Sequence, residues 1–277
     1  MKIFKTLRSH QPSFSTDNSL NLTAPKSWKD LTQEQLHYVL FLLSAFEDHT
    51  VIKTYMFVRF TGIHVISKDR FGWKCFVRVN WGRRKFFTIQ AWQIESLLGQ
   101  MSYIDSYEGM GVRLEDIHGL HAVNIDLHGV SFIDYLNLEK YYQGYLMEKK
   151  DKYIELMGTV LYRKRVREKA LLKNKYADRV RAIKMDNAEY LSVLMWYSYV
   201  KSVFAKAFTH FFKRLDSDDM DSFDMIKAMN VQIRALTNGD VTKEQTIYNI
   251  DCWRALTELD QKACEAEEYE KMKAHGK

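Results

Sequence analysis

Three histidines and two aspartates in one short stretch have side chains suited to holding a metal ion. His118, His121 and His128 lie in the sequence IHGLHAVNIDLHG, with Asp116 and Asp126 beside them. Imidazole nitrogens and carboxylate oxygens ligate zinc and iron, and a loop can bring such side chains together. The spacing matches no established metal motif. The sequence therefore favours histidines that lie at the surface or in hydrogen bonds, with metal binding by the three histidines as the alternative.

The other residue types that catalyse reactions form no recognisable catalytic pattern. Cys75, Cys252 and Cys264 are widely spaced, without a CxxC pair, which favours small apolar side chains over a reactive thiol. The chain contains no phosphate-binding glycine loop, no nucleophile elbow and no HExxH zinc motif. We therefore expect a non-enzymatic protein without a cofactor.

A basic and aromatic segment over residues 68–85 offers a second kind of chemistry. Alternation over residues 71–89, around a glycine-containing turn at 80–82, predicts a β-hairpin. The side chains expected on one strand face and at the turn are Lys74, Phe76, Arg78, Arg83, Arg84 and Lys85. Cations beside aromatic rings that stack on bases are how proteins hold single-stranded nucleic acid. The alternative is a solvated sheet face whose phenylalanine packs under a neighbouring helix.

The largest charge feature is the window over residues 162–184, which contains ten Lys or Arg and two acids. A helix with this net charge of +8 would attract a polyanion or an acidic protein surface. Its apolar residues are few, so a mobile linker between two helical halves is the other interpretation. The cations proposed for such contacts are Arg163, Lys164, Arg165 and Arg167.

The elements that must position these residues are mostly helices, because proline and glycine are scarce and apolar residues recur at helical spacing. Helices are expected over 31–46, 49–62, 91–101, 131–147, 153–173, 189–212, 223–236 and 242–273. Loops with short strands are expected over 102–130. The predicted fold class is mainly α, an irregular multi-helix protein with a small β-hairpin.

Local signals mark several helix ends. Thr32 with Gln35, and Thr242 with Gln245, have the spacing of capping boxes. Asn238 followed by glycine predicts a helix stop. The chain is expected to contain four parts. These are a flexible arm over 1–24, a helical domain with the hairpin over 25–160, a basic linker or helix over 161–186, and a C-terminal helical subdomain over 187–277.

The last helix changes character along its length. An apolar stripe reaches Leu259, and Trp253 lies outside that stripe, so we expect Trp253 to anchor the helix in the domain. Beyond Leu259 the apolar stripe continues only in alanines and one cysteine, among acids and lysines. This part is expected to be a solvated end or a strip that docks a basic partner.

Composition indicates a protein made in a reducing compartment. Three cysteines are too few for a disulfide framework, and the first residues lack a secretory signal. The longest apolar block, over 39–46, is shorter than the about 20 residues that span a bilayer. A cytoplasmic protein without membrane contact is expected.

Three stretches carry a resemblance to a known group of proteins. IRALTNGDVTKEQTIYNIDCWRALTELDQKACEAEEYEK, HGVSFIDYLNLEKYYQGYL and AEYLSVLMWYSYVKSVF resemble an uncharacterised protein family from phage-like regions of gut bacterial genomes. The resemblance covers most of residues 25–272 and brings no functional residues with it. Such proteins are encoded near tail and tape-measure genes, which implies a role in tail assembly or structure.

The resemblance and the charge pattern together give a functional expectation. The resemblance implies a phage or prophage protein that acts in virion assembly, in the tail, through contacts with other phage structural or assembly proteins. It would reside in the host cytoplasm during assembly, or in the virion. The alternative is a nucleic-acid-binding accessory protein that uses the basic segments 68–85 and 162–184, and a metal-dependent enzyme built on the three histidines is the third hypothesis.

Overall fold

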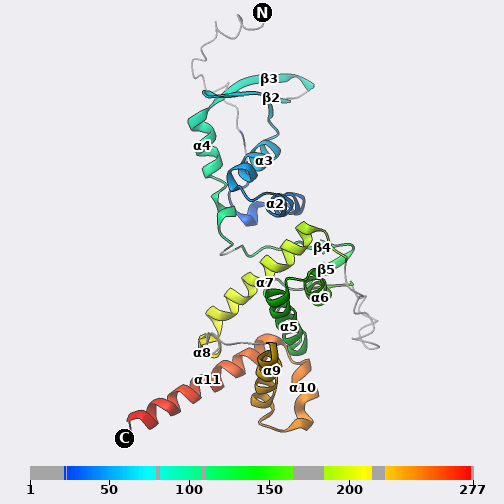
Figure 1. The fold of residues 1–277 in the computed structure, drawn as a ribbon, viewed down its shortest axis with the longest axis vertical. Helices are drawn as coiled ribbons and strands as arrows, with labels where there is room; N and C mark the ends of the chain where they lie inside the picture. Colours follow the sequence, from blue (N-terminus) through cyan, green and yellow to red (C-terminus); the bar gives the residue numbers. More distant parts are fainter. Residues whose placement is uncertain are drawn as a thin grey trace, which may run out of the picture. The chain divides into compact units, whose positions relative to one another are not determined.

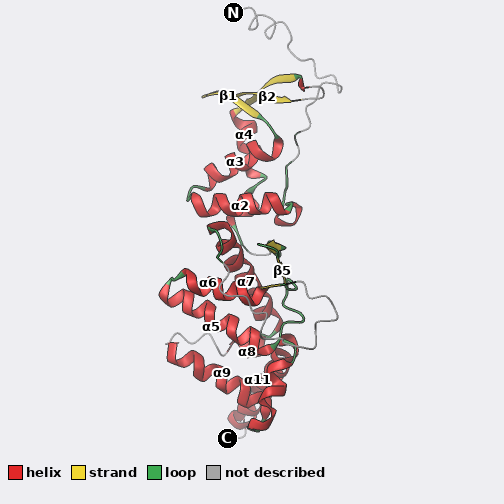
Figure 2. Ribbon diagram, turned by 90° about the vertical axis from the view of Figure 1, so that its right-hand side faces the viewer, coloured by secondary structure: helices red, strands yellow, loops and turns green. Residues whose placement is uncertain are grey.

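The chain is mainly α-helical with two small antiparallel sheets, so the expected fold class is confirmed (Figures 1 and 2). The structure, a computed structural model, describes residues 22, 24–78, 82–107, 110–164, 184–213 and 222–275. These residues form two compact units. Unit 1 contains residue 22, residues 24–26 and the described residues of 53–102, and unit 2 contains residues 27–52 and the described residues from 103 onward.

Unit 1 is built on a three-stranded antiparallel sheet in the order β1-β2-β3. The strands are β1 (His64–Asp69), β2 (Gly72–Arg78) and β3 (Arg84–Gln90), flanked in sequence by α3 (His49–Thr61) and α4 (Ala91–Gly99). Cys75, Val77 and Ile89 are buried on the face that the helices cover. On the same face, the ring of Trp73 lies 6.2 Å from that of Phe57 in α3.

The strands show the alternation of buried and exposed side chains that predicted the hairpin. In β2, Cys75 and Val77 are buried, whereas Lys74 and Arg78 are exposed. Of the expected turn residues 80–82, residues 80 and 81 lie outside the described residues. β1 was not predicted, because its side chains are largely exposed and therefore carry no apolar alternation.

Unit 2 is a bundle of helices around a core rich in aromatic residues. Its first half contains η2 (Trp28–Asp30), α2 (Gln33–Ala45), η4 (Ser102–Asp105), which begins at the unit boundary, α5 (Phe132–Glu148) and α6 (Asp151–Leu161). α7 (Asn187–Ala207) packs against both α2 and α6, and its Trp196, Tyr197 and Phe204 are buried. Helices on both sides of the basic window therefore pack together within unit 2.

A second small antiparallel sheet connects loop segments of unit 2. It contains β4 (Asp116–Ile117), β5 (Leu120–Ala122) and β6 (Tyr162–Arg163), in that order. β6 corrects one prediction, because the helix expected over 153–173 ends at Leu161. Tyr162 leaves the helix to pair with Ala122, and its buried hydroxyl donates to the Leu114 carbonyl at 3.0 Å. Residues 165–173 of that prediction lie outside the described residues.

Helix ends follow local hydrogen bonds, as expected at two places. Thr32 and Gln35 form the predicted capping box at the start of α2. α9 (Ser222–Thr237) ends at Asn238 and Gly239, which both have positive φ, and the Gly239 amide donates to the Arg234 carbonyl. Gly239 allows this left-handed stop without a side-chain clash.

The helix expected over 189–212 is two helices. α7 ends at Ala207, and α8 (Thr209–Lys213) begins after Phe208. The carboxylate of Asp260 accepts hydrogen bonds from the amides of His210 and Phe211, both at 2.9 Å. This distant aspartate satisfies the first amides of α8, and sequence spacing alone cannot reveal such a cap.

The single helix expected over 242–273 is wrong, because three helical segments occupy that range. They are η6 (Val241–Lys243), α10 (Glu244–Asn249) and α11 (Cys252–His275). Asp240, rather than Thr242, provides the cap, since its carboxylate accepts from the Thr242 amide at 3.0 Å. The break before α11 arises because the Ile250 carbonyl accepts from Phe132 and the Cys252 amide donates to Val130.

The part of α11 beyond Leu259 is attached to unit 2 over about half its length, which corrects the expected solvated end. Asp260 caps α8, Ala263 is buried, and the carboxylate of Glu267 lies 3.2 Å from His210. Only after Glu267 do large apolar side chains, Tyr269 and Met272, become exposed.

A helix that crosses a membrane must be both long and apolar. Across the described ranges, none of the helices combines the length and the apolar character needed to cross a bilayer.

Candidate functional site

An aromatic row crosses the outer face of the β1-β2-β3 sheet, meaning the face opposite Cys75 and Val77. The strand register places Phe76 of β2 opposite both His64 of β1 and Phe86 of β3. The His64 ring stacks on the Phe76 ring, with centroids 4.6 Å apart, and the Phe86 centroid lies 5.7 Å from that of Phe76. Each strand of the sheet thus contributes one ring.

Positively charged side chains flank this aromatic row. Arg78 and Arg84 are directly opposite each other in the register, and the Arg84 guanidinium lies 5.0 Å from the Phe76 centroid. Lys74 is exposed on the other side of Phe76 along β2. Two like charges on one cross-strand pair repel each other, so an anion placed between them would be stabilised.

Two other predicted cations of this segment lie elsewhere. Lys85 is opposite Val77 in the register, so it belongs to the covered face rather than the aromatic one, and it is half-buried. Arg83 is exposed just before β3. The sequence predicted Lys74, Phe76 and Arg78 on one face. It did not identify His64 or Phe86, which only the strand register brings beside Phe76.

The basic window contributes little to the described surface. Arg163 makes an ion pair of 3.1 Å with Asp134, whose side chain is 8% exposed, and it also donates to the Val160 carbonyl. Arg163 therefore compensates a buried carboxylate inside unit 2. Lys164 is exposed, while Arg165 and Arg167 lie outside the described residues.

The three histidines considered for metal binding each have a different partner. His118 Nε2 lies 3.2 Å from a Glu189 oxygen, and His121 Nδ1 lies 3.0 Å from an Asp116 oxygen. His128 stacks on the Trp253 ring at 4.5 Å. These contacts are those of hydrogen-bonded and stacked histidines rather than of a shared site.

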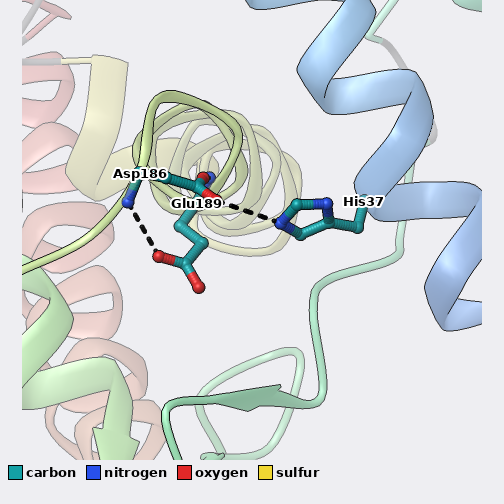
Figure 3. A group of neighbouring side chains, drawn as sticks. All are labelled: His37, Asp186 and Glu189. Carbon is teal, nitrogen blue, oxygen red and sulfur yellow. Dashed lines mark hydrogen bonds and ion pairs between the residues drawn. The ribbon is translucent and has the colours of Figure 1, made fainter.

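A different group of potential metal-binding side chains comes together in unit 2. Figure 3 shows His37 of α2 directed at Asp186, with Glu189 beside it at the start of α7. One ligand atom from each of the three lies within 4.8 Å of the other two. The spacing Asp186-x-x-Glu189 is a capping-box signal that sequence reasoning can find, but nothing in the sequence connects it to His37.

Trp253, the expected anchor, is surrounded by aromatic rings. Its ring centroid lies 5.2 Å from that of Phe204 and 5.3 Å from that of Phe208. Its Nε1 donates to the Asp126 carbonyl at 2.5 Å. Together with the stacked His128, these contacts connect the first turn of α11 to α7 and to the loop before α5.

The thiols of two cysteines are protonated at neutral pH. Burial raises the pKa of Cys252 to about 12, and burial also raises the pKa of Cys75. A nucleophilic cysteine needs a lowered pKa, so neither thiol is poised for covalent catalysis.

Comparison of the chain with protein-family models, with curated proteins and with solved structures found no match.

Proposed function

We propose that this chain is a non-enzymatic binding protein that holds single-stranded nucleic acid on the outer face of the β1-β2-β3 sheet. The observation that carries the proposal is the aromatic row His64, Phe76 and Phe86 beside Arg78 and Arg84. Aromatic rings offer a stacking surface to any base, and adjacent guanidinium groups attract the phosphates between bases.

Exposure supports Phe86 as the principal stacking residue. Its side chain is 52% exposed, whereas one side of the Phe76 ring stacks against His64 and a guanidinium also lies over this ring. An exposed phenylalanine on a strand is unfavourable in water unless something covers it. A stacked base would remove this apolar surface from water while its phosphates reach the arginines.

The test is fluorescence anisotropy with a labelled oligothymidylate of about ten nucleotides, a length within the range of known single-strand sites. Phe86→Ala is expected to weaken binding by about tenfold, because stacking on one base contributes about 1–3 kcal/mol. Phe41→Ala is the matched control, since Phe41 is 50% exposed but belongs to α2. Equal affinities for the two variants and the wild type would contradict the proposal.

The charge contribution is tested separately by varying the salt concentration. Arg78→Gln and Arg84→Gln should each reduce the slope of log affinity against log salt by about 0.7, the value expected for one phosphate contact on a single strand. Arg254→Gln on α11 removes a similarly exposed charge and should leave the slope unchanged. If no salt-sensitive binding occurs at low ionic strength, the nucleic-acid proposal fails.

A role in virion assembly, expected from the resemblance, is the second proposal. One observation that favours protein contacts is the exposed end of α11, where Tyr269 and Met272 are one helical turn apart. Co-expression with the neighbouring tail proteins, followed by pull-down, should recover a partner that Tyr269→Ala loses. Normal infectious particles from a phage that lacks this gene would refute the assembly role.

A further inference from the structure

The group formed by His37, Asp186 and Glu189 lies where two packed helices of unit 2 meet. His37 projects from α2, and the two acids occupy the start of α7, which packs closely on α2 (Figure 3). The side chains of His37 and Asp186 are 43% and 56% exposed, while that of Glu189 is 9% exposed. The group therefore has one buried carboxylate and an open side that solvent reaches.

Backbone hydrogen bonds hold both carboxylates in place. The Asp186 carboxylate accepts from the Glu189 amide, and the Glu189 carboxylate accepts from the Asp186 amide, each at 2.8 Å. Such a reciprocal capping box fixes the rotamers of both acids. It performs the role that outer hydrogen bonds perform around metal ligands, since it orients each oxygen before an ion arrives.

One ligand atom from each of His37, Asp186 and Glu189 lies within 4.8 Å of the other two, close enough for the three side chains to share one ion. His37 Nε2 lies 3.3 Å from an Asp186 oxygen. Two ligands bound to zinc at about 2.0–2.1 Å in tetrahedral geometry are about 3.4 Å apart.

We propose that His37, Asp186 and Glu189 bind a divalent transition-metal ion. Mixed imidazole and carboxylate donors favour zinc and its neighbours over calcium or magnesium, which prefer oxygen alone. The helix dipole opposes a cation at the start of α7, but it amounts to only about +0.5 of a charge. The two carboxylates bring −2, so the local charge still favours binding. The ion would connect α2 to the start of α7.

The experiment is calorimetric titration of the full-length, metal-stripped protein with Zn²⁺ alone. We expect saturable binding of about one ion per chain, and His37→Ala should weaken it at least about tenfold. His49→Ala is the matched control, because His49 forms a similar pair with Asp105 at 2.6 Å and similar exposure. Its zinc affinity should equal that of the wild type.

Two further variants separate metal binding from folding. Asp186→Asn and Glu189→Gln keep the capping box, because asparagine caps helices well and glutamine suits the third position. Both should retain the helical circular dichroism spectrum yet lose zinc affinity. If the wild type shows no stoichiometric binding, or if His37→Ala and Asp186→Asn bind zinc as tightly as the wild type, these contacts are hydrogen bonds only and the proposal is refuted.

Discussion

Glu139 keeps its charge inside unit 2 because three donors surround its carboxylate. Tyr197 donates to it at 2.8 Å, Lys201 at 2.6 Å and Gln143 at 2.9 Å. Burial alone would raise the pKa of Glu139, but Lys201 and these hydrogen bonds together hold it below the ordinary value of 4.5. A depressed pKa means that the folded state favours the ionised carboxylate.

The resulting prediction concerns acid stability. Stability from Glu139 is fully present above its unfolded pKa near 4.5 and is lost as the pH falls through the lower folded value. Glu139→Gln should therefore destabilise the protein at pH 7, by about 2 kcal/mol for the charged hydrogen bonds it weakens. Urea unfolding measures this difference, which should shrink below pH 4.5. A difference that does not change with pH would contradict the assignment.

Trp253 provides the second prediction for a single residue. Trp253→Ala removes a ring that contacts Phe204, Phe208 and His128, and it leaves the Asp126 carbonyl without its donor. The free energy of unfolding should fall by about 3 kcal/mol, as for other large-to-small core changes.

Trp92→Ala is the control for Trp253→Ala in guanidinium unfolding, since Trp92 is 64% exposed in α4. Its cost should remain below about 1 kcal/mol. Equal costs for the two variants would show that Trp253 is no anchor.

The environment of a single residue could be predicted where its neighbours along the chain determine that environment. In β2, the adjacent residues Cys75 and Phe76 lie on opposite faces of the sheet, and the alternation of a strand is enough to predict this. The position of His37 beside Asp186 could not be predicted, because their contact depends on how α2 packs on α7. The candidate metal group was therefore invisible, although the capping signal at Asp186 was present.

Among the elements, α11 allows the clearest prediction. Truncation after Glu268 should change the free energy of unfolding by less than about 0.5 kcal/mol, because the described side chains that it removes, at residues 269–274, are exposed. Truncation after Leu259 removes Asp260, and with it the cap of α8, which alone contributes about 1 kcal/mol. It also removes the buried Ala263 and should cost at least about 2 kcal/mol in total.

Thermal or urea unfolding of the two truncated chains distinguishes these outcomes. Asp260→Ala in the full-length chain isolates the part due to the cap. If the truncation after Leu259 is as stable as the longer one, the contacts with α8 contribute nothing and the end of α11 is only a solvated strip.

Element boundaries were predictable only where a local hydrogen bond sets them. The capping box at Thr32 and the stop at Asn238 depend on residues within one helical turn. The end of α6 and the break before α11 depend on partners far along the chain, namely Ala122 and Val130. Apolar periodicity continues through both breaks, so helices predicted from this periodicity extend past them.

At the scale of the whole molecule, the two units each contain their own core. Gly72 lies at the start of β2 with a φ of 146°, and a Cβ there would meet the Ile89 carbonyl oxygen at 2.0 Å. Gly72→Ala should therefore disrupt the pairing of β2 with β3. Trp253→Ala should affect the helices of unit 2 instead.

Hydrogen exchange measured by mass spectrometry can follow both units in one experiment. In Gly72→Ala, peptides from β1, β2 and β3 should exchange faster, while those from α5 and α7 remain protected as in the wild type. Trp253→Ala should give the reverse pattern. Gly62→Ala is a control for backbone strain alone, since its φ is 66° but no atom lies within 4 Å of its Cβ position. Faster exchange in both units of either variant would show that the chain unfolds as one cooperative body.

The edges of the β1-β2-β3 sheet have a consequence for solubility. β3 pairs only with β2 in the described part of the chain, and its run Phe86, Phe87, Thr88 and Ile89 is uncharged and prone to self-association. Arg84 and Lys85 precede this run, and charges at that position oppose edge-to-edge aggregation. A bulge between Val65 and Ser67 distorts the β1 edge, and such a bulge also opposes edge-to-edge pairing between copies. Arg84 would thus act as a gatekeeper that keeps copies of the chain apart.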